Sequence, residues 1–261
     1  MLGGKEVFRY EYPIFEHKNI LKKKMLDDLR DYPFFLSRMI LGDRGDGILQ
    51  GCGLAWEEGV LEAEPGLLCY HGDIYRMEES FAMDCAPTDR QTYIKVRFSV
   101  SDRERDYRRG VGEVYLDTDA PKEGEMELGR FRLQEGARLR TVYENFEDYR
   151  TEYDTVNRIH VPYLQPDGAG LWPQMLMAYG EELLETGTED VYDISFAVQL
   201  LGTAGYVSAE LVRRYAGMAG NGGREDNSVL YAGLLRILKE RKAGRRGQRK
   251  QEGAVRQMIL L

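Results

Sequence analysis

The residues best suited to acid–base chemistry are three histidines, His17, His71 and His160, and each stands alone in the sequence. Zinc sites usually hold paired ligands a few residues apart, so isolated histidines predict no metal centre. One polar constellation remains, in which Asp154, Asn157 and His160 could act as an acid, an orienting amide and a base. No nucleophile or oxyanion-binding loop accompanies it. We therefore interpret it as a hydrogen-bonded connection between two halves of the chain.

The glycine clusters lack the residues that nucleotide binding requires. Residues 217–224 contain no lysine followed by serine or threonine, which a phosphate-binding loop needs. After Gly110 and Gly112, Tyr115 stands where a dinucleotide fingerprint has its third glycine. The chain also lacks the Gly-x-Ser-x-Gly turn of serine hydrolases. We expect no enzyme and no cofactor, and a hydrolase whose site assembles only in the fold stays as an alternative.

Composition places the chain among folded proteins. Of its 261 residues 43% are hydrophobic and 31% charged, and the net charge is -8, which disfavours binding of nucleic acid over the whole surface. No apolar run reaches the ~18 residues that span a bilayer, and the first twelve residues lack the apolar core of a signal peptide. The cysteines, Cys52, Cys69 and Cys85, are odd in number and widely spaced, so we expect them reduced. These features predict a cytoplasmic protein without membrane insertion.

The elements that must carry any site divide the chain into four predicted parts. Residues 1–45 are predicted to form an aromatic segment and two helices. The first helix runs from about Asn19 to Asp31, where Pro33 interrupts it, and the second starts at Asp31-Tyr32-Pro33 with the proline in its first turn. Residues 46–150 form an antiparallel β-sheet or sandwich, with a hairpin turn at residues 57–59 and a half-buried strand at residues 92–100. The predicted fold class is α+β.

The third part, residues 151–243, is predicted as a connector followed by a small helical bundle. Thr188 can cap its second helix, Ser208 the third, and Asn227 or Ser228 a fourth that ends near residue 242. The apolar face of the second helix is expected at Val191, Ile194, Val198 and Leu201. The fourth part, residues 244–261, is a basic tail that we expect to be poorly ordered.

A recurring pattern of short strands separated by glycine turns marks the start of the β-region. The segments that carry it are Ile48-Leu49-Gln50-Gly51-Cys52-Gly53-Leu54, Pro65-Gly66-Leu67-Leu68 and Gly72-Asp73-Ile74-Tyr75. This pattern of strands and glycine turns resembles the first β-domain of phage-tail baseplate and tail-fibre adaptor proteins. With Glu127-Leu128-Gly129-Arg130-Phe131 and Ile159-His160-Val161-Pro162-Tyr163, the pattern is similar to a clostridial family associated with contractile, phage-tail-like injection systems. The resemblance covers about the first two thirds of the chain and brings no catalytic motif.

The resemblance implies a structural baseplate or tail-fibre adaptor subunit that acts by protein–protein assembly. Its implied partners are other baseplate or tail subunits and further copies of itself, as a trimer or dimer, by analogy with type VI secretion baseplate subunits. Aromatic residues are enriched at interfaces, so the predicted contacts are Phe8, Tyr10, Tyr12 and Phe15, together with the tyrosines of the connector. Filling of the core is an equal interpretation for any one of them.

The alternative function is that of a nucleic-acid-associated accessory protein that uses the basic tail. The residues that would contact an anionic partner are Arg245, Arg246, Arg249 and Lys250. No aromatic residue is interleaved with them to stack on bases, and a solvated tail is the preferred interpretation.

Overall fold

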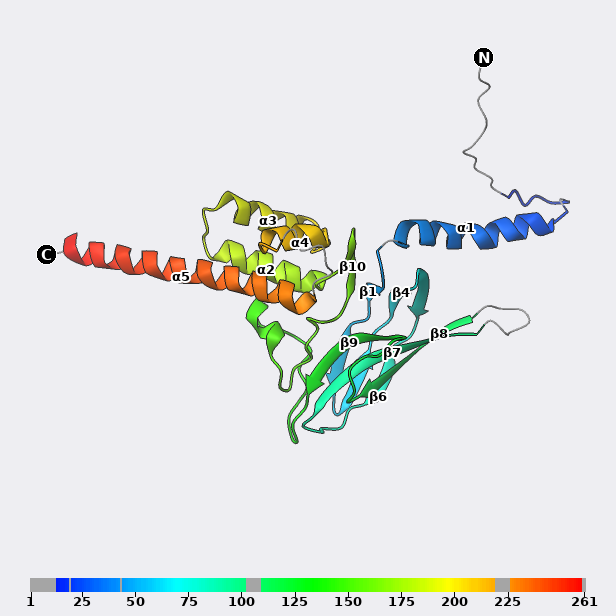
Figure 1. The fold of residues 1–261 in the computed structure, drawn as a ribbon, viewed down its shortest axis with the longest axis horizontal. Coiled ribbons are helices and arrows are strands. Elements are labelled where there is room, and N and C mark those ends of the chain that lie inside the picture. Colours follow the sequence, from blue (N-terminus) through cyan, green and yellow to red (C-terminus); the bar gives the residue numbers. More distant parts are fainter. Residues whose placement is uncertain (1–12, 19, 43, 102–108, 219–225, 260–261) are drawn as a thin grey trace, which may run out of the picture.

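The computed structural model describes residues 13–18, 20–42, 44–101, 109–218 and 226–259. Within these ranges helix α1 (Lys23–Leu41) is followed by β-strands, a short 3-10 helix η1 (Phe146–Arg150), two further strands and four helices. Figure 1 shows the sheets on one side of the helical group, with α1 and the end of α5 projecting in opposite directions. The predicted α+β class is confirmed. No helix in the described ranges has the length and apolar character needed to cross a membrane.

Eleven strands form three sheets in the described part of the chain. Their bounds are β1 Gly47–Gly51, β2 Leu54–Glu57, β3 Val60–Ala63, β4 Gly66–Tyr70, β5 Asp73–Met77, β6 Phe81–Asp84, β7 Gln91–Ser101, β8 Arg109–Asp117, β9 Glu125–Arg132, β10 Tyr163–Gln165 and β11 Gly168–Gly170. The sheet orders are β11-β10-β1-β4-β5, β2-β3-β6 and β8-β7-β9. All pairs are antiparallel except β1 with β10, which are parallel. This parallel pair joins residues from both sides of the predicted boundary at residue 150, and the domain division itself stays a prediction.

The hairpin predicted at residues 57–59 is confirmed. Glu58 and Gly59 both have positive φ angles, 47° and 90°, between the paired strands β2 and β3. Two consecutive positive φ angles are those of a type I′ turn, whose twist matches that of the flanking strands. The turn between β4 and β5 repeats the arrangement with His71 at 50° and Gly72 at 77°. His71 is thus a turn residue.

The three sheets enclose one apolar core. On the inward face of β7, Ile94, Val96 and Phe98 are buried as the alternation of the sequence predicts, whereas Val100, expected on the same face, is 50% exposed near the end of the strand. It packs in one cluster with residues from the other two sheets, such as Ile48 and Leu61. The three cysteines are free and buried, and burial raises the pKa of the Cys52 and Cys85 thiols to about 11.

The other face of β7 contains a charge that the sequence does not show to be buried. Lys95 is 0% exposed, and its ammonium group donates to Asp117 at 2.7 Å and to Glu125 at 2.9 Å. Tyr115 donates a short hydrogen bond to the second oxygen of Glu125. A buried charge is tolerated when it is paired and hydrogen-bonded. This face of the sheet is therefore closed by an ionic cluster.

Four helices surround the second core. Helices α2 (Pro173–Glu185), α3 (Val191–Gly202), α4 (Ala209–Tyr215) and α5 (Asn227–Ile259) bury Tyr179, Leu200 and Leu234 between them. Pro173 stands at the first position of α2, where a missing N–H costs nothing. Ser208 caps α4 by accepting from the Leu211 N–H, as predicted.

Two other predicted caps are wrong. Asp190, and not Thr188, caps α3 by accepting from the Tyr192 N–H. The Thr188 hydroxyl donates to the Asp193 carboxylate instead. At the start of α5 the Asp226 carboxylate accepts from the Ser228 N–H, where Asn227 or Ser228 was expected to cap. A carboxylate at a helix N-terminus also interacts favourably with the helix dipole, which explains why aspartates cap α3 and α5.

Two predicted helix boundaries are also wrong. Pro33 does not divide the N-terminal helix, since α1 runs unbroken from Lys23 to Leu41. The last helix does not end near residue 242, because α5 continues to Ile259. Glycine costs about 1 kcal/mol in a helix interior and does not by itself stop a helix of good helix formers. The side chains of residues 245–259 lie outside the described part.

A buried arginine joins the sheets to the helices. Arg158 is 2% exposed, and its guanidinium lies 4.6 Å from the ring centre of Trp172 and 5.3 Å from that of Tyr163. It donates to the carbonyl of Cys52 at 2.8 Å. Trp172 precedes α2 and packs against both cores. The arginine therefore links β1 and β10 of the sheets with the start of the helical group.

We expect Arg158→Ala to lower the free energy of unfolding by about 3 kcal/mol. The change removes packed side-chain volume and leaves a buried carbonyl without its donor. Arg158→Met, which restores volume without charge, should lose less. Urea unfolding followed by tryptophan fluorescence measures both, with the exposed Arg90→Ala as a control expected within about 0.5 kcal/mol of wild type. If Arg158→Ala and Arg158→Met lowered the free energy of unfolding equally, the side-chain volume that methionine restores would contribute nothing to stability.

The ionic cluster around Lys95 predicts acid sensitivity. A hydrogen bond from Tyr115, with others from the Lys122 N–H and Lys95, lowers the pKa of Glu125 to about 2. A carboxylate with a depressed folded pKa stabilises the fold above its unfolded pKa, and this contribution is lost as the pH falls through the folded value. Stability should therefore decline between about pH 4.5 and pH 2. Thermal unfolding at successive pH values should show a shallower decline for Glu125→Gln, and identical slopes would contradict the assignment.

Candidate protein interface

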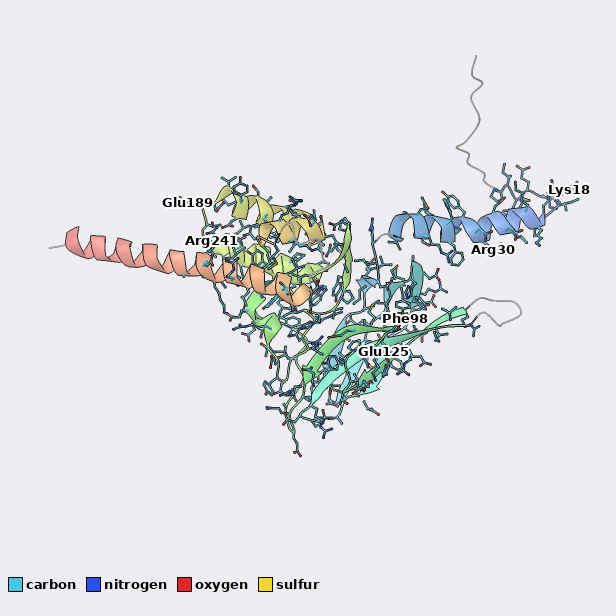
Figure 2. The ribbon with its side chains drawn as sticks, in the orientation of Figure 1. Lys18, Arg30, Phe98, Glu125, Glu189 and Arg241 are labelled. Atoms are coloured by element: carbon cyan, nitrogen blue, oxygen red, sulfur yellow. The ribbon has the colours of Figure 1, made fainter. Side chains whose placement is uncertain are left out.

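Helix α1 is attached to the rest of the chain mainly at its C-terminal end. There Leu41 is buried against Cys69 and Leu164. Arg38 forms an ion pair with Asp73 of β5 at 2.9 Å. From this point the helix projects away from the sheets, as Figure 2 shows for the segment that bears Lys18 and Arg30. Most of α1 is therefore a free-standing helix.

The intrinsic stability of α1 is low. Pro33 lies in its interior, where proline costs about 3 kcal/mol. Its first turn contains Lys23 and Lys24 and no acidic residue, although the helix dipole favours acids at that end. Most helical stability in proteins comes from packing of an apolar face. A long projecting helix with these features is expected to be stabilised by a partner.

The apolar face of α1 is continuous and exposed. Met25, Leu29, Tyr32, Leu36 and Met39, here called the α1 seam, follow one another at spacings of four and three residues. Tyr32 is 61% exposed and Met39 69%. The spacing is that of a coiled-coil seam, in which each side chain inserts between four residues of a facing helix. The surface of α1 is therefore shaped for a second helix.

Helix α3 has a second exposed apolar face, and here the sequence analysis was wrong. Val191, Ile194, Val198 and Leu201, here called the α3 seam, were expected to face the core. Val191 is instead 73% exposed and Val198 56%. The buried face of α3 contains Asp193, Phe196, Ala197 and Leu200.

Both faces of α3 have residues at helical spacing, so periodicity alone cannot choose between them. The buried face is decided by α2, where the absent side chain of Gly180 leaves room for Ala197 and Leu200. A helix that is apolar on both faces is usually covered on both. The α3 seam is therefore a second candidate contact surface.

The predicted interface residues are partly described. Phe8, Tyr10 and Tyr12 lie outside the described residues, and Phe15, just before α1, is exposed. Among the connector tyrosines, Tyr149 is buried and its ring stacks on Tyr143 at 4.0 Å. These two tyrosines therefore contribute to the helical core.

The polar constellation does not share one site. The Asp154 carboxylate accepts from the Gln134 N–H, and the Asn157 side chain accepts from the Ile159 N–H. The His160 ring nitrogen Nδ1 lies 3.5 Å from Asp226 at the start of α5. Each residue thus bonds in a different place. The His160 contact reaches a helix of the second half, whereas the Asn157 bond is local. The interpretation that the three residues connect the two halves of the chain stays a prediction.

The tail residues Arg245, Arg246, Arg249 and Lys250 belong to the part of α5 whose side chains are not described. Their contact with an anionic partner stays a prediction. The described part of the same helix uses its basic residues internally, since Arg241 pairs with Asp193 at 2.5 Å and Lys242 pairs with Glu182.

A pocket of about 350 Å³ lies where β9, His160 and the start of α5 meet. Its acidic lining residues have internal partners. Glu127 accepts two hydrogen bonds of 2.7 Å from Arg130, and Asp46 accepts from the His71 N–H. Within the described ranges no group of three or more His, Cys, Asp or Glu side chains is placed to hold a metal ion. The carboxylates of this pocket thus serve the fold.

The α1 seam could have been recognised in the sequence. Its four-three spacing continues across Pro33, and the prediction of two helices divided it there. No sequence pattern identifies the exposed face of α3, because its exposure depends on which face α2 covers.

Comparison with known proteins finds no matching family model and no matching curated protein. The chain also resembles solved structures, among them the following two, with TM-scores below 0.5. A cryo-electron microscopy structure of the type VI secretion system TssK-TssF-TssG baseplate subcomplex matches with a TM-score of 0.41 and 15% identity, over 88% of this chain and 100% of that chain. A crystal structure of TssK matches with a TM-score of 0.41 and 9% identity, over 90% of this chain and 72% of that chain. At these values the function must be argued from the chain's own residues.

The exposure of the α1 seam predicts that its residues can be changed without loss of stability. The double substitution Leu29→Glu with Leu36→Glu should alter the free energy of unfolding of dilute protein by no more than about 0.5 kcal/mol per site, since glutamate and leucine have similar helix propensities. Leu41→Ala, at the buried end of the same helix, should cost about 2–4 kcal/mol. Denaturant unfolding compares them. A large loss for the double variant would mean that the seam packs against its own chain.

Proposed function

We propose that this protein is a structural subunit of a baseplate in a contractile, phage-tail-like particle, acting as an adaptor by protein–protein assembly and not by catalysis. The observation that carries the proposal is the α1 seam, the apolar face of a projecting helix, which is exposed at Leu29, Tyr32, Leu36 and Met39. Exposed apolar patches of this kind are typical of sites that bind other proteins.

The architecture supports an assembly role in two further ways. The sheets and the helical group are held together by the buried Arg158, so two contact surfaces on different elements keep a defined relation. The described acidic pocket has its carboxylates matched to internal donors such as Arg130. A scaffold with outward apolar helices and internally paired pocket carboxylates suits binding.

The class of assembly comes from the sequence resemblance to baseplate and tail-fibre adaptor proteins. The residues of that resemblance lie in β-strands, with Ile48 in β1, Leu68 in β4 and Ile74 in β5. These strands are neighbours in one sheet. Helix α1 precedes β1 and packs on β5, so the proposed contact element is attached to the sheet that carries the resemblance.

The test is recovery of partners from the native host with a tag at the C-terminus, away from α1. Wild type should bring down sheath, tube, spike or other baseplate proteins, identified by mass spectrometry. Charges in the α1 seam, Leu29→Glu with Leu36→Glu, should reduce this recovery at least about tenfold, because buried interface charges are costly.

The matched control is Phe34→Glu, which places the same charge on an exposed aromatic residue of α1 outside the seam. It should leave recovery close to wild type. Recovery of nucleic acid or ribosomal proteins in place of tail components, lost on removal of residues 244–261, would replace this proposal with the nucleic-acid alternative.

A further inference from the structure

We propose that the α1 seam of one copy of this protein docks on the α3 seam of a second copy. The contact is head-to-tail, with a different surface used on each partner. The inference rests on the proposed assembly function and specifies one of its contacts.

The two seams match in spacing. The α1 seam runs at intervals of four, three, four and three residues, and the α3 seam at three, four and three. At 1.5 Å rise per residue they are about 21 Å and about 15 Å long. Such seams pack with knobs in holes. The long side chains of α1, such as Met25 and Leu29, face shorter β-branched ones of α3, such as Val191 and Val198, so that large and small alternate across the contact.

The charges around the seams are complementary. Residues 13–42 contain six lysines and arginines and four acidic residues, an excess of positive charge in a chain of net charge -8. Residues 173–202, which form α2 and α3, contain six acidic residues and no lysine or arginine. Three of the six, Glu182, Asp190 and Asp193, pair with Arg241 or Lys242 of α5. The negative charge offered to a partner therefore comes from exposed residues such as Glu181 and Glu189. Figure 2 shows Lys18 in the segment before α1, Arg30 on α1 and Glu189 beside the start of α3. Opposite charge at the rim of an apolar contact favours this pairing and speeds encounter.

The seams cannot meet within one copy. Leu41 and the Arg38–Asp73 ion pair hold the end of α1 against the sheets. From there α1 projects away from the helical group that contains α3 (Figure 1). Because the two surfaces differ and lie on different sides of the molecule, each copy keeps one free seam after pairing. A contact of this type closes into a ring or continues as an open chain.

Pairing of α1 with α1 from another copy is the competing arrangement. It would bring two helices with the same sign of excess charge together and leave the α3 seam exposed. The two arrangements make opposite predictions for variants in α3, and this difference decides the experiment.

Sedimentation velocity of the purified full-length chain tests the proposal. Wild type should associate as its concentration rises. The α1-seam variant (Leu29→Glu with Leu36→Glu) and the α3-seam variant (Ile194→Glu with Val198→Glu) should each associate about 100-fold more weakly, since each loses two buried apolar contacts to charge. Circular dichroism and thermal unfolding establish that both variants are folded. Phe34→Glu and Tyr192→Glu, which charge exposed aromatic residues of the same helices outside the seams, should associate like wild type.

Mixing the two seam variants gives the decisive readout. One variant retains an intact α3 seam and the other an intact α1 seam, so the mixture should form a 1:1 complex that grows no further. An α3-seam variant that associates like wild type, or a mixture that stays monomeric, would overturn the proposal. Wild type that remains a monomer at all concentrations would also overturn it. Recovery of baseplate proteins from the host would still test the broader function separately.

Discussion

The placement of the helices relative to the sheets depends on one buried cation. Arg158 has no carboxylate among the partners described for it, and its guanidinium is held by two aromatic rings and the carbonyl of Cys52. Arginine suits this place because its planar, weakly hydrated group stacks on rings while donating in its own plane. The three groups that it contacts belong to the loop after β1, to β10 and to the start of α2.

Other polar contacts converge on the same junction. The Gln165 side chain of β10 donates to the Leu171 carbonyl and accepts from the Val207 N–H. Asp167, between β10 and β11, accepts from the Ala209 and Glu210 N–H groups at the start of α4. Asn227 of α5 donates to the carbonyls of two residues in the same connector. The joint thus contains directional hydrogen bonds as well as apolar contacts, although Arg158 Nε and the Tyr163 hydroxyl are buried there without a hydrogen-bond partner among the described residues. Directional bonds specify geometry more strictly than apolar contacts do.

This joint matters for assembly because the two apolar seams lie on either side of it. Helix α1 is fixed to the sheets through Leu41, and α3 is fixed to α2 through the close approach at Gly180. The relation between the seams therefore follows from the joint at Arg158. In a head-to-tail assembly, neighbouring copies are related by the rotation between the two contact surfaces of a single copy. The joint at Arg158 would therefore determine the geometry of the assembly.

The sequence alone determined the local structure of the protein. The turn at Gly59, the burial of Ile94, Val96 and Phe98 in β7, and the cap of α4 at Ser208 each depend on residues a few positions apart, and these predictions were confirmed. The tertiary structure alone decided which surfaces were covered. Lys95 and Arg158 are buried because distant residues supply their partners. The α3 seam is exposed because α2 covers the opposite face, and helical periodicity is the same for a face that packs and a face that does not.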